Sequence, residues 1–402
     1  MQTNISEYYK TIPEYNIADK ILRSCVHCGF CTATCPTYQL LGNELDSPRG
    51  RIYLIKQLLE GAKVTRKTQL HLDRCLTCRA CETICPSGVE YGHLLDIGRK
   101  YVDAKIKRSI IDRIKRFALI NILPYPIRFG ILFKLTSYIN FLLPSHLKTT
   151  ASAKIKKTKS QLNLSRKMIL VAGCVQPTLA PQINNATINL LNKLDIEVIT
   201  IAKSLCCGAV THHLSQENST LTTIKKNIDL WWPQIQSGVE AIIVNASGCT
   251  VMVKDYGVIL LNDSHYSEKA AKVSLLCKDI SEVLQDTNLS KFKNNNHRRV
   301  AFHPPCTLQH GMKLNGVVEN ILESAGYQLT KIKDNHLCCG SSGTYSILQS
   351  KLSNRLAQNK VDNIEVDFPE LVVTANIGCL HHLRSKMNVP VKHWLELFYD
   401  IE

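Results

Sequence analysis

The chain has 402 residues, of which 45% are hydrophobic, and this is enough material for two or three packed domains. Its 17 cysteines are too dilute for a short disulfide-stapled secreted module, and residues 1–20 have no basic start followed by an apolar core, so we expect a reducing compartment in which cysteines bind metal or act as redox thiols. The net charge of +16 is typical of nucleic-acid-binding proteins, but residues 99–159 alone carry 15 Lys/Arg against 2 Asp/Glu without a base-stacking aromatic pattern, so no nucleic-acid partner is expected.

Two cysteine motifs of identical spacing stand out in the first hundred residues. Residues 25–36 read CVHCGFCTATCP and residues 75–86 read CLTCRACETICP, so both follow C-x2-C-x2-C-x3-C-P. Three thiolates spaced in this way can wrap one [4Fe–4S] cube, while the fourth cysteine, before proline, ligates the cube of the other motif. The spacing therefore predicts two crossed clusters, one on Cys25, Cys28, Cys31 and Cys85 and one on Cys75, Cys78, Cys81 and Cys35.

A helix is predicted between the two motifs. Ser47 suits the N-cap, Pro48 fits the first helical position, and Gly61 follows the last apolar turn. The first turn carries Arg49 and Arg51. These two residues either place positive charge near an anionic cluster and raise its reduction potential, or simply pair with the acidic residues of the preceding turn.

The basic region of residues 99–159 mixes its charges with apolar residues, as in IKRSIIDRIKRFALINILPYPIRFGILFKL. Its longest uncharged run, residues 135–147, has 13 residues and contains Pro144, whereas a membrane span needs about 20. We therefore expect amphipathic helices and no transmembrane helix. Their apolar faces either pack on the protein with the lysines in water, or lie on a membrane surface or a partner.

The remaining cysteines reveal an internal repeat of about 130 residues. The tetrapeptide LCCG occurs at residues 205–208 and again at 337–340, and the matched cysteines are offset by 132, 132, 132 and 130 positions. The two sets are Cys174, Cys206, Cys207 and Cys249, and Cys306, Cys338, Cys339 and Cys379. Cys277 has no counterpart and is expected to be an ordinary buried thiol.

In each copy the cysteines follow short apolar runs that are expected to be buried strands, such as KMILVAG before Cys174 and RVAFHPP before Cys306. Strands alternate with helical segments, as in parallel α/β sheets, whose functional groups collect beyond the carboxyl ends of the strands. Four converging thiolates per copy fit an iron–sulfur cluster, a zinc ion or structural remnant, or redox-active free thiols. Gly208 and Gly340 permit the close backbone approach that adjacent ligands need.

The predicted fold is an α-helical ferredoxin-like N-terminal domain followed by two duplicated α/β cysteine-rich domains, here called CCG copy 1 and CCG copy 2. We expect a helical ferredoxin domain with both [4Fe–4S] motifs in residues 1–100 and a basic amphipathic helical connector in 101–160. CCG copy 1 then occupies residues 161–290 and CCG copy 2 residues 291–402.

This arrangement resembles the iron–sulfur subunit of bacterial glycolate oxidase over nearly the whole chain. The stretches that carry the resemblance are ELDSPRGRIYLIK (44–56), NASGCTVMVKDYG (245–257), HPPCTLQHGMK (303–313), CCGSSGTYSILQ (338–349) and ANIGCLHHL (375–383). The resemblance implies a complex with flavin-binding subunits that oxidise glycolate to glyoxylate. It implies that electrons leave the flavin through [4Fe–4S] clusters toward the respiratory quinone pool, and that the chain is cytoplasmic, peripheral at the inner membrane.

Related families share the cysteine-rich copies, namely the iron–sulfur subunits of lactate and glycerol-3-phosphate oxidation and a heterodisulfide reductase subunit with thiol–disulfide chemistry. In the last family the repeat usually ends in CxxC, but here the endings are CTVM (249–252) and CLHH (379–382). The chain shows no G-x-G-x-x-G after a strand, no Walker loop and no other flavin or nucleotide signature. We therefore expect no catalytic residue, and an isolated chain that is inactive on substrate and serves as one subunit of a 2-hydroxy-acid dehydrogenase complex.

Overall fold

The structure is a computed structural model that describes the chain except residues 6–11, 139–163, 202–204, 290–291, 293–297 and 400–402. Its contacts divide the chain into two compact units. Unit 1 contains Met1–Lys115, Cys306–Lys313 and Lys333–Asn363, and unit 2 contains Arg116–Pro305, Leu314–Ile332 and Ile364–Glu402.

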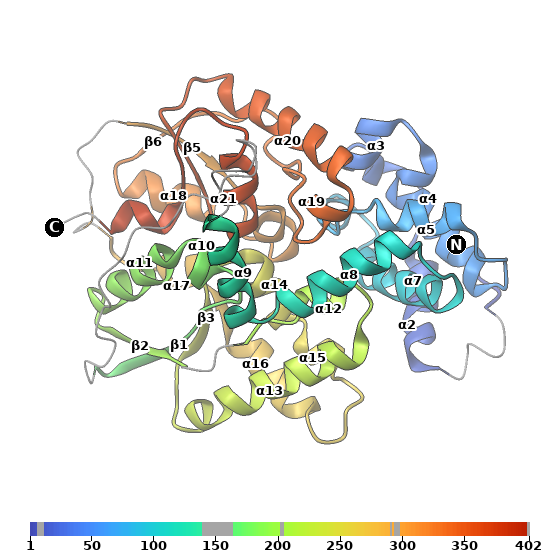
Figure 1. The fold of residues 1–402 in the computed structure, drawn as a ribbon, viewed down its shortest axis with the longest axis horizontal. Coiled ribbons are helices and arrows are strands. Elements are labelled where there is room, and N and C mark those ends of the chain that lie inside the picture. The colour runs from blue at the N-terminus through green and yellow to red at the C-terminus, as the bar shows by residue number, and fades with distance from the viewer. Residues whose placement is uncertain (6–11, 139–163, 202–204, 290–291, 293–297, 400–402) are drawn as a thin grey trace. The chain divides into compact units, whose positions relative to one another are not determined.

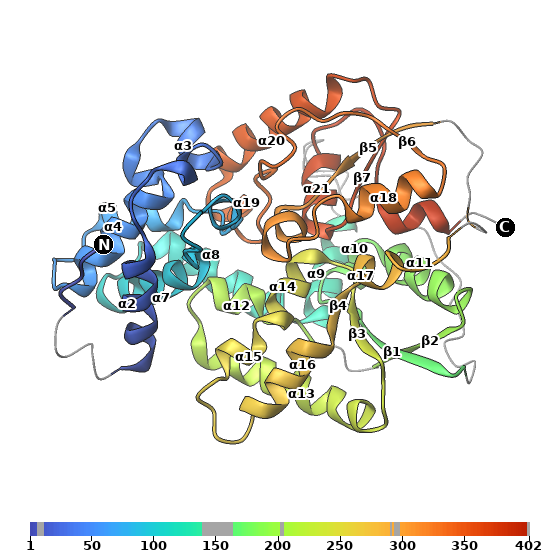
Figure 2. The same cartoon turned by 180° about the vertical axis from the view of Figure 1, so that it is seen from behind.

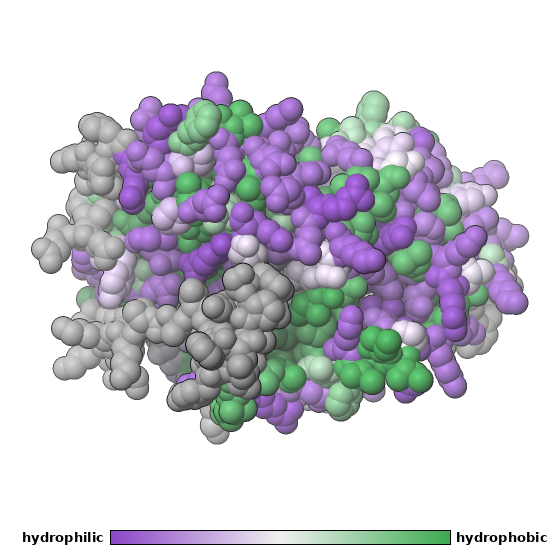
Figure 3. Space-filling view, turned by 45° about the horizontal axis from the view of Figure 1, so that its top comes forward, coloured by the Kyte–Doolittle hydropathy of each residue, from purple (hydrophilic) through white to green (hydrophobic). Residues whose placement is uncertain are grey.

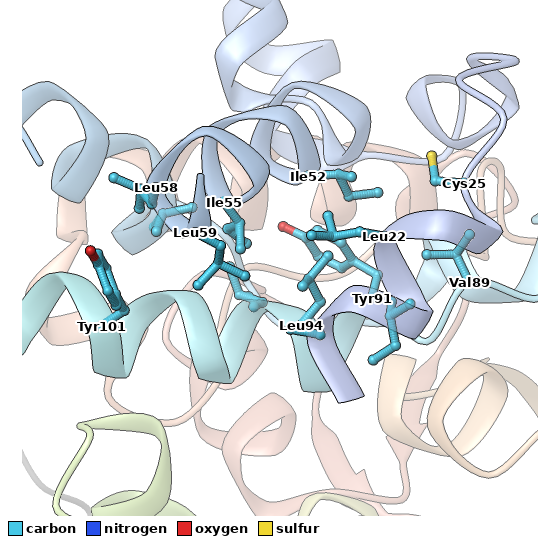
Figure 4. Packing of buried hydrophobic residues seen from close by; sticks show 14 of the residues in the cluster. Leu22, Cys25, Ile52, Ile55, Leu58, Leu59, Val89, Tyr91, Leu94 and Tyr101 are labelled. Atoms are coloured by element: carbon cyan, nitrogen blue, oxygen red, sulfur yellow. The ribbon is translucent and has the colours of Figure 1, made fainter. Parts of the chain in front are cut away.

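Three helices build the core of unit 1: α2 (Pro13–Ser24), α4 (Pro48–Leu59) and α7 (Tyr91–Lys105). Their apolar side chains interleave, as Figure 4 shows for Leu22, Ile55 and Leu94, which are fully buried. Shorter elements connect them: η1 (Phe30–Thr32), α3 (Pro36–Leu41), η2 (Glu44–Asp46), α5 (Arg66–Asp73) and α6 (Ala80–Thr83). The buried apolar side chains of these helices pack with cysteines of both loops, those that precede η1 and α6, and so hold the loops in place.

The helix predicted between the motifs is confirmed as α4. Ser47 is its N-cap and accepts a hydrogen bond from the Gly50 N–H at 3.0 Å, and Pro48 is its first residue. Gly50 is required here, because a Cβ atom would lie 2.0 Å from the carbonyl oxygen of Glu44. The start of α4 is therefore held tightly against η2.

Unit 1 also takes in the cysteine loops of CCG copy 2, with η5 (Thr307–Gly311), α19 (Tyr345–Leu348) and most of α20 (Ser350–Glu365). These segments pack on the second ferredoxin motif. Ser342 Oγ donates to the Leu76 carbonyl at 2.6 Å, and the Tyr345 hydroxyl donates to the Arg74 carbonyl at 3.1 Å. The second cysteine motif and the cysteine loops of CCG copy 2 thus belong to the same compact unit.

Unit 2 contains two four-stranded parallel sheets of the same topology (Figures 1 and 2). The first has the order β2-β1-β3-β4, with β1 (Arg166–Val171), β2 (Ile196–Thr200), β3 (Ala241–Val244) and β4 (Cys277–Asp279). The second has the order β6-β5-β7-β8, with β5 (Arg299–His303), β6 (Gln328–Leu329), β7 (Leu371–Thr374) and β8 (Val391–His393). This repeated sheet confirms the duplicated α/β fold.

Helices cover the sheets and carry the chain between parallel strands, as such connections require. In copy 1 they are α10 (Gln176–Leu179), α11 (Pro181–Asn192), α12 (Ala209–His213), α13 (Glu217–Gln236), α14 (Ser247–Lys254), α15 (Tyr256–Ile259), α16 (Ser267–Leu276) and α17 (Ile280–Leu284). In copy 2 they include α18 (Val317–Ser324), α21 (Ile377–Arg384) and the 3-10 helix η6 (Trp394–Phe398). The copies contact each other where β3 and β7 end, because the Ser247 N–H donates to the Ala375 carbonyl at 3.2 Å.

Two helices of the basic region, α8 (Ile110–Ile122) and α9 (Pro126–Tyr138), expose their apolar side chains. Leu119 is the only buried residue among those of α8, whereas Ile110 is 73% exposed and Ile127, on α9, is 78% exposed. Leu119 is packed on the protein, whereas many other apolar side chains of these two helices are uncovered, so the two alternatives from the sequence both remain open. In Figure 3, hydrophobic residues, drawn in green, form a patch in the lower half of the face that is shown.

Candidate iron–sulfur centres

The first centre is an open cavity of about 430 Å³ in unit 1. Cysteines from both motifs line it: Cys25, Cys28 and Cys31 from the first motif, with Cys81 and Cys85 from the second. Cys28 is exposed and Cys25 is buried, so one side of this cavity faces solvent. The backbone N–H of Arg49, in the first turn of α4, donates to the sulfur of Cys31.

The second centre is a cavity of about 310 Å³ lined by four cysteines, Cys35, Cys75, Cys78 and Cys81. Thr37, Arg51 and Tyr91 line the same cavity. The fourth cysteine of each motif therefore reaches the cavity of the other, which is the arrangement that a crossed pair of clusters requires. Each cavity offers the soft thiolate donor set that iron–sulfur clusters use.

The same backbone conformation shapes both cysteine loops. The residue before the second cysteine is left-handed in each, with φ of +56° at His27 and +53° at Thr77. The residue after it is left-handed as well, with φ of +86° at Gly29 and +58° at Arg79. Non-glycine residues adopt this conformation at a cost of about 1–2 kcal/mol each, so the loops hold strain that a bound group would offset.

Burial governs the protonation of these thiols. It raises the pKa of Cys31 to about 11, and it raises the pKa values of Cys78 and Cys81 well above the ordinary value. Without a metal, the thiols of Cys31, Cys78 and Cys81 therefore keep their protons at neutral pH. Because thiolates and not thiols are the ligands, cluster binding must release these protons.

Arg49 and Arg51, which the sequence left with two alternative roles, differ in the structure. Arg49 forms an exposed ion pair with Glu44, with an Nε–Oε1 distance of 2.5 Å, and it also lines the first cavity. Arg51 is fully buried, pairs with Asp46 at 3.5 Å and lines the second cavity. Each arginine thus pairs with an acid, as the second alternative expected, and each also lines a cavity, with the buried charge at the second.

The four thiols of CCG copy 1 lie together at the sheet edge in unit 2. Cys174 follows β1, Cys206 and Cys207 precede α12, and Cys249 lies in the first turn of α14. Cys174 and Cys207 both hydrogen bond to the sulfur of Cys206, which lowers the pKa of Cys206 and raises theirs, and Cys207 also contacts Cys249. The four sulfurs therefore form a row of neighbours, in which Cys206 contacts Cys174 and Cys207, and Cys207 contacts Cys249.

Two buried polar side chains hold the paired cysteines of copy 1 in place. Asn227 Nδ2 donates to the Cys206 carbonyl at 2.8 Å, and the Tyr256 hydroxyl donates to the Cys207 carbonyl at 2.7 Å. Tyr256 stacks on Trp231 with ring centroids 6.2 Å apart. The backbone of the pair is therefore rigid before any metal binds.

In CCG copy 2 the thiols are divided between the two units. Cys306, Cys338 and Cys339 belong to unit 1, where the Cys306 and Cys338 sulfurs lie 3.7 Å apart. Gly340 follows them with φ of +87°, a backbone conformation that favours glycine. In unit 2, Cys379 lies within 4.8 Å of His303.

All 17 cysteines lie in the described residues, and none of them forms a disulfide. Cys277 is buried in β4, where burial raises its pKa and its sulfur faces the Thr250 carbonyl at 3.9 Å. It packs in the apolar core of copy 1. Its environment agrees with that of an ordinary buried thiol.

Two known domain families match this chain. Residues 21–89 match the 4Fe-4S dicluster domain, and residues 169–254 and 300–384 each match the cysteine-rich domain. The glycolate oxidase iron-sulfur subunit of Escherichia coli (strain K12) is 49% identical over 399 residues, which cover 99% of this chain and 98% of that protein. The chain belongs to the family of glycolate oxidase iron–sulfur subunits.

Other members and relatives agree with this membership. The probable glycolate oxidase iron-sulfur subunit of Bacillus subtilis (strain 168) is 30% identical over 92% of this chain and 89% of that protein. Lactate utilization protein A of the same organism is 23% identical over 58% of this chain and 98% of that protein. The resemblance to this family that the sequence motifs indicated is confirmed.

Several residues at the centres were missed by the sequence reasoning. Tyr91 and Thr37 reach sulfurs of the second centre, but neither stands at a spacing that marks a ligand neighbour. Ser342 and Tyr345 join copy 2 to the second motif across more than 260 positions of sequence. A long-range contact of this kind leaves no local pattern in one sequence.

Proposed function

We propose that the chain is the electron-transfer subunit of a flavin-dependent glycolate dehydrogenase complex. The observation that carries the proposal is the convergence of eight thiols from two motifs on two neighbouring cavities of unit 1. In this proposal Cys25, Cys28, Cys31 and Cys85 hold one [4Fe–4S] cluster, and Cys75, Cys78, Cys81 and Cys35 hold the other. When bound, such clusters accept and donate single electrons.

The side chains around the two cavities differ in their exposure to solvent and in what packs against them. Beside the first cavity, Cys28, Val26 and Phe30 are exposed, so a redox partner can approach it closely. Beside the second, Leu76 packs with Tyr345 and Leu356 of copy 2. The cysteine loop of the first cavity is therefore exposed at these side chains, whereas Leu76 of the second loop is covered by copy 2.

Glycolate oxidation itself belongs to partner subunits in this proposal. A 2-hydroxy acid loses two electrons as a hydride, which a flavin accepts, and this chain has no flavin signature. The partners are accordingly flavin-binding subunits, and the electrons continue toward the quinone pool. We expect the isolated chain to be inactive on glycolate.

The exposed helices α8 and α9 support a peripheral position at the cytoplasmic face of the inner membrane. Among the described residues no single helix has the length and composition of a membrane span, although α8 together with Pro126–Leu135, bent by 112°, passes that test as a pair. Residues 104–135 carry eight Lys/Arg and a single acid, Asp112. A basic, apolar surface of this kind binds at the headgroups of anionic lipids.

Vesicle binding tests this position. The double substitution I114E/F117E places two charges on the exposed face of α8, and we expect the protein to lose co-sedimentation with vesicles that contain anionic phospholipid. L275E is the matched control, because Leu275 is 75% exposed on α16 outside this face. Equal binding by the wild type and I114E/F117E would contradict the membrane role of α8.

We also propose that the CCG copies bind an additional iron–sulfur cluster or zinc. Copy 1 supports this best, because Cys174, Cys206, Cys207 and Cys249 all lie in one unit and their neighbouring sulfurs are in contact. The metal content separates the alternatives, since two clusters alone give about eight irons per chain. C206S should then lower iron or zinc below the wild-type value, whereas C277S should leave both unchanged.

The test of the whole proposal uses the complex purified without oxygen with its flavoprotein subunits. With C28S or C78S, glycolate should still reduce the flavin while electron delivery to a quinone analogue is lost. C277S serves as the matched control and should retain both steps. If the isolated chain oxidises glycolate, or lactate replaces glycolate as the better substrate in a screen, the proposed role or the proposed substrate is wrong.

A further inference from the structure

The wall of the second cavity contains a fully buried cation, Arg51. Its side chain is 1% exposed and lines the cavity beside Cys35 and Cys75. Its Nε donates to the His71 carbonyl at 2.7 Å, and one terminal nitrogen donates to Thr37 Oγ1 at 3.1 Å. These bonds hold the guanidinium in one position, and it keeps its charge at any working pH.

Hydroxyl groups connect this cation to the sulfurs of the same cavity. Thr37 Oγ1, which accepts from Arg51, lies 3.3 Å from Cys35 Sγ. The Tyr91 hydroxyl donates to Cys75 Sγ at 3.6 Å, and the Thr77 N–H donates to the same sulfur at 3.4 Å. Hydrogen bonds to cluster sulfurs and nearby positive charge are two of the factors that set the reduction potential of a cluster.

The charges near this cavity leave a positive excess. Asp46 is shared by Arg51 at 3.5 Å and Arg74 at 3.0 Å, with the ring of His71 also 3.0 Å from it. Arg99 adds a further cation and donates to the Cys75 carbonyl at 2.7 Å. Besides Asp46, the acid on this side is Glu82, which accepts from the Gly92 N–H at 2.6 Å.

The first cavity has cations as well, but they are accessible to water. Arg49 is half-exposed and pairs with Glu44 through two nitrogens, at 2.5 and 3.2 Å. The terminal ammonium of Met1 donates to the Cys25 carbonyl at 2.7 Å and, in an exposed contact, to that of Arg23. Water screens such charges strongly, whereas a buried charge is screened much less.

We propose that Arg51, acting with Tyr91, raises the reduction potential of the cluster held at the second cavity. This inference rests on the proposed function, since it presumes a cluster on Cys35, Cys75, Cys78 and Cys81. A buried cluster gains an electron in surroundings of low polarity, which disfavours the added negative charge. The fixed guanidinium and the Tyr91 hydroxyl stabilise that charge and keep the second cluster reducible.

An EPR-monitored redox titration of the whole complex, prepared without oxygen, measures the two clusters separately. R51Q retains hydrogen-bonding groups but removes the charge, and we expect one of the two signals to move to a more negative midpoint potential. Y91F should move the same signal in the same direction by less. R51K should move it less than R51Q, because the positive charge is kept.

R49Q is the matched control, since Arg49 stands two residues away on the same helix turn and its side chain is 37% exposed, against 1% for Arg51. It should leave the signal that responds to R51Q at its wild-type potential. If R51Q fails to retain iron, Y91F decides, because it deletes one hydroxyl and leaves the fold intact. The inference is overturned if the midpoint potentials of R51Q are unchanged or, where R51Q does not retain iron, if those of Y91F are unchanged. A wild-type complex without two clusters overturns the proposed function instead.

Discussion

At the scale of single residues, Asp279 and His393 occupy equivalent positions in the two copies. Each ends the last strand of its sheet, β4 or β8, and caps the helix that follows with its side chain. Each also forms a capping box with a glutamate three residues on, Glu282 or Glu396. Burial raises the pKa of Asp279 to about 6 and lowers the pKa of His393 to about 3, so the two caps respond to acid in opposite ways.

H393N should reduce the loss of stability in acid. Because the folded-state pKa of His393 lies below its unfolded value, the unfolded chain binds the proton first, and stability is present above pH 6.5 and lost as the pH falls. The loss from this group is about 2 kcal/mol between pH 7 and pH 5. Denaturant midpoints of wild type and H393N at both pH values measure it, and an unaltered pH dependence in H393N contradicts the assignment.

D279N should have the opposite effect. The folded-state pKa of Asp279 lies above its unfolded value, so protonation stabilises the folded chain as the pH falls from 7 toward 4. The gain is about 1 kcal/mol between pH 7 and pH 5, and it disappears in D279N because the amide does not titrate. In the same denaturation experiment, D279N should therefore be more sensitive to acid than the wild type.

Gly340, beside the paired cysteines of copy 2, should not tolerate a side chain. Its φ is +87°, and a Cβ atom would lie 2.8 Å from the Ser353 carbonyl oxygen. We expect G340A to lower the free energy of unfolding by about 2–4 kcal/mol. G343A is the control, because its Cβ would meet no atom within 4 Å and its φ of +56° should cost only about 1 kcal/mol.

The sequence predicted the candidate ligands from a cysteine spacing that is repeated in both motifs and in both copies, and the structure brings the eight cysteines of the motifs to two cavities. The sequence was not sufficient to find what surrounds them. Tyr91 begins α7 and lies 16 positions from Cys75, and it reaches the sulfur only because α7 packs on α4. The role of Arg51 depends on its burial, which no spacing reveals.

At the scale of elements, the start of α4 should be sensitive to its cap. The buried Ser47 hydroxyl accepts from the Gly50 N–H at 3.0 Å and donates to Glu44 Oε1 at 2.9 Å. S47A should lower the free energy of unfolding by about 1–2 kcal/mol. Thr65 caps α5 at an exposed position, so T65A should cost less, and equal effects of the two substitutions would argue against a special role for the α4 cap.

The longer elements were predicted where a strong local pattern exists. The apolar runs before Cys174 and Cys306 became β1 and β5, and the capped segment after Ser47 became α4. The three-residue strands β4 and β8 were missed, because so short a run has no measurable alternation and is fixed by its neighbour in the sheet. The exposure of α8 was left open, since an amphipathic pattern does not say what covers its apolar face.

At the scale of the whole molecule, unit 1 should depend on its bound clusters. His27, Thr77 and Arg79 hold left-handed backbone in the two cysteine loops, and the free energy of cluster binding would offset this strain. Removal of the clusters with an oxidant and a chelator should therefore open cleavage sites in residues 25–36 and 75–86 during limited proteolysis. The sheets of unit 2 serve as the internal control and should stay protected.

The loops of copy 2 contact the second ferredoxin motif and belong to the same unit. The spacing of the repeat does not predict this contact. Spacing identified two equal copies, but the cysteine loops of only one copy belong to unit 1. The domain boundaries expected from the sequence stay a prediction. The two copies are therefore alike in topology and different in their surroundings.

The most direct measurement of the central claim is spin quantification of the chain, purified without oxygen and reduced by dithionite, together with its iron content. The account predicts two reducible [4Fe–4S] clusters and about eight irons from the two motifs, with C28S and C78S each removing one cluster signal and leaving the other. Colourless material without an EPR signal after reduction, or a single cluster that survives both substitutions, would contradict it.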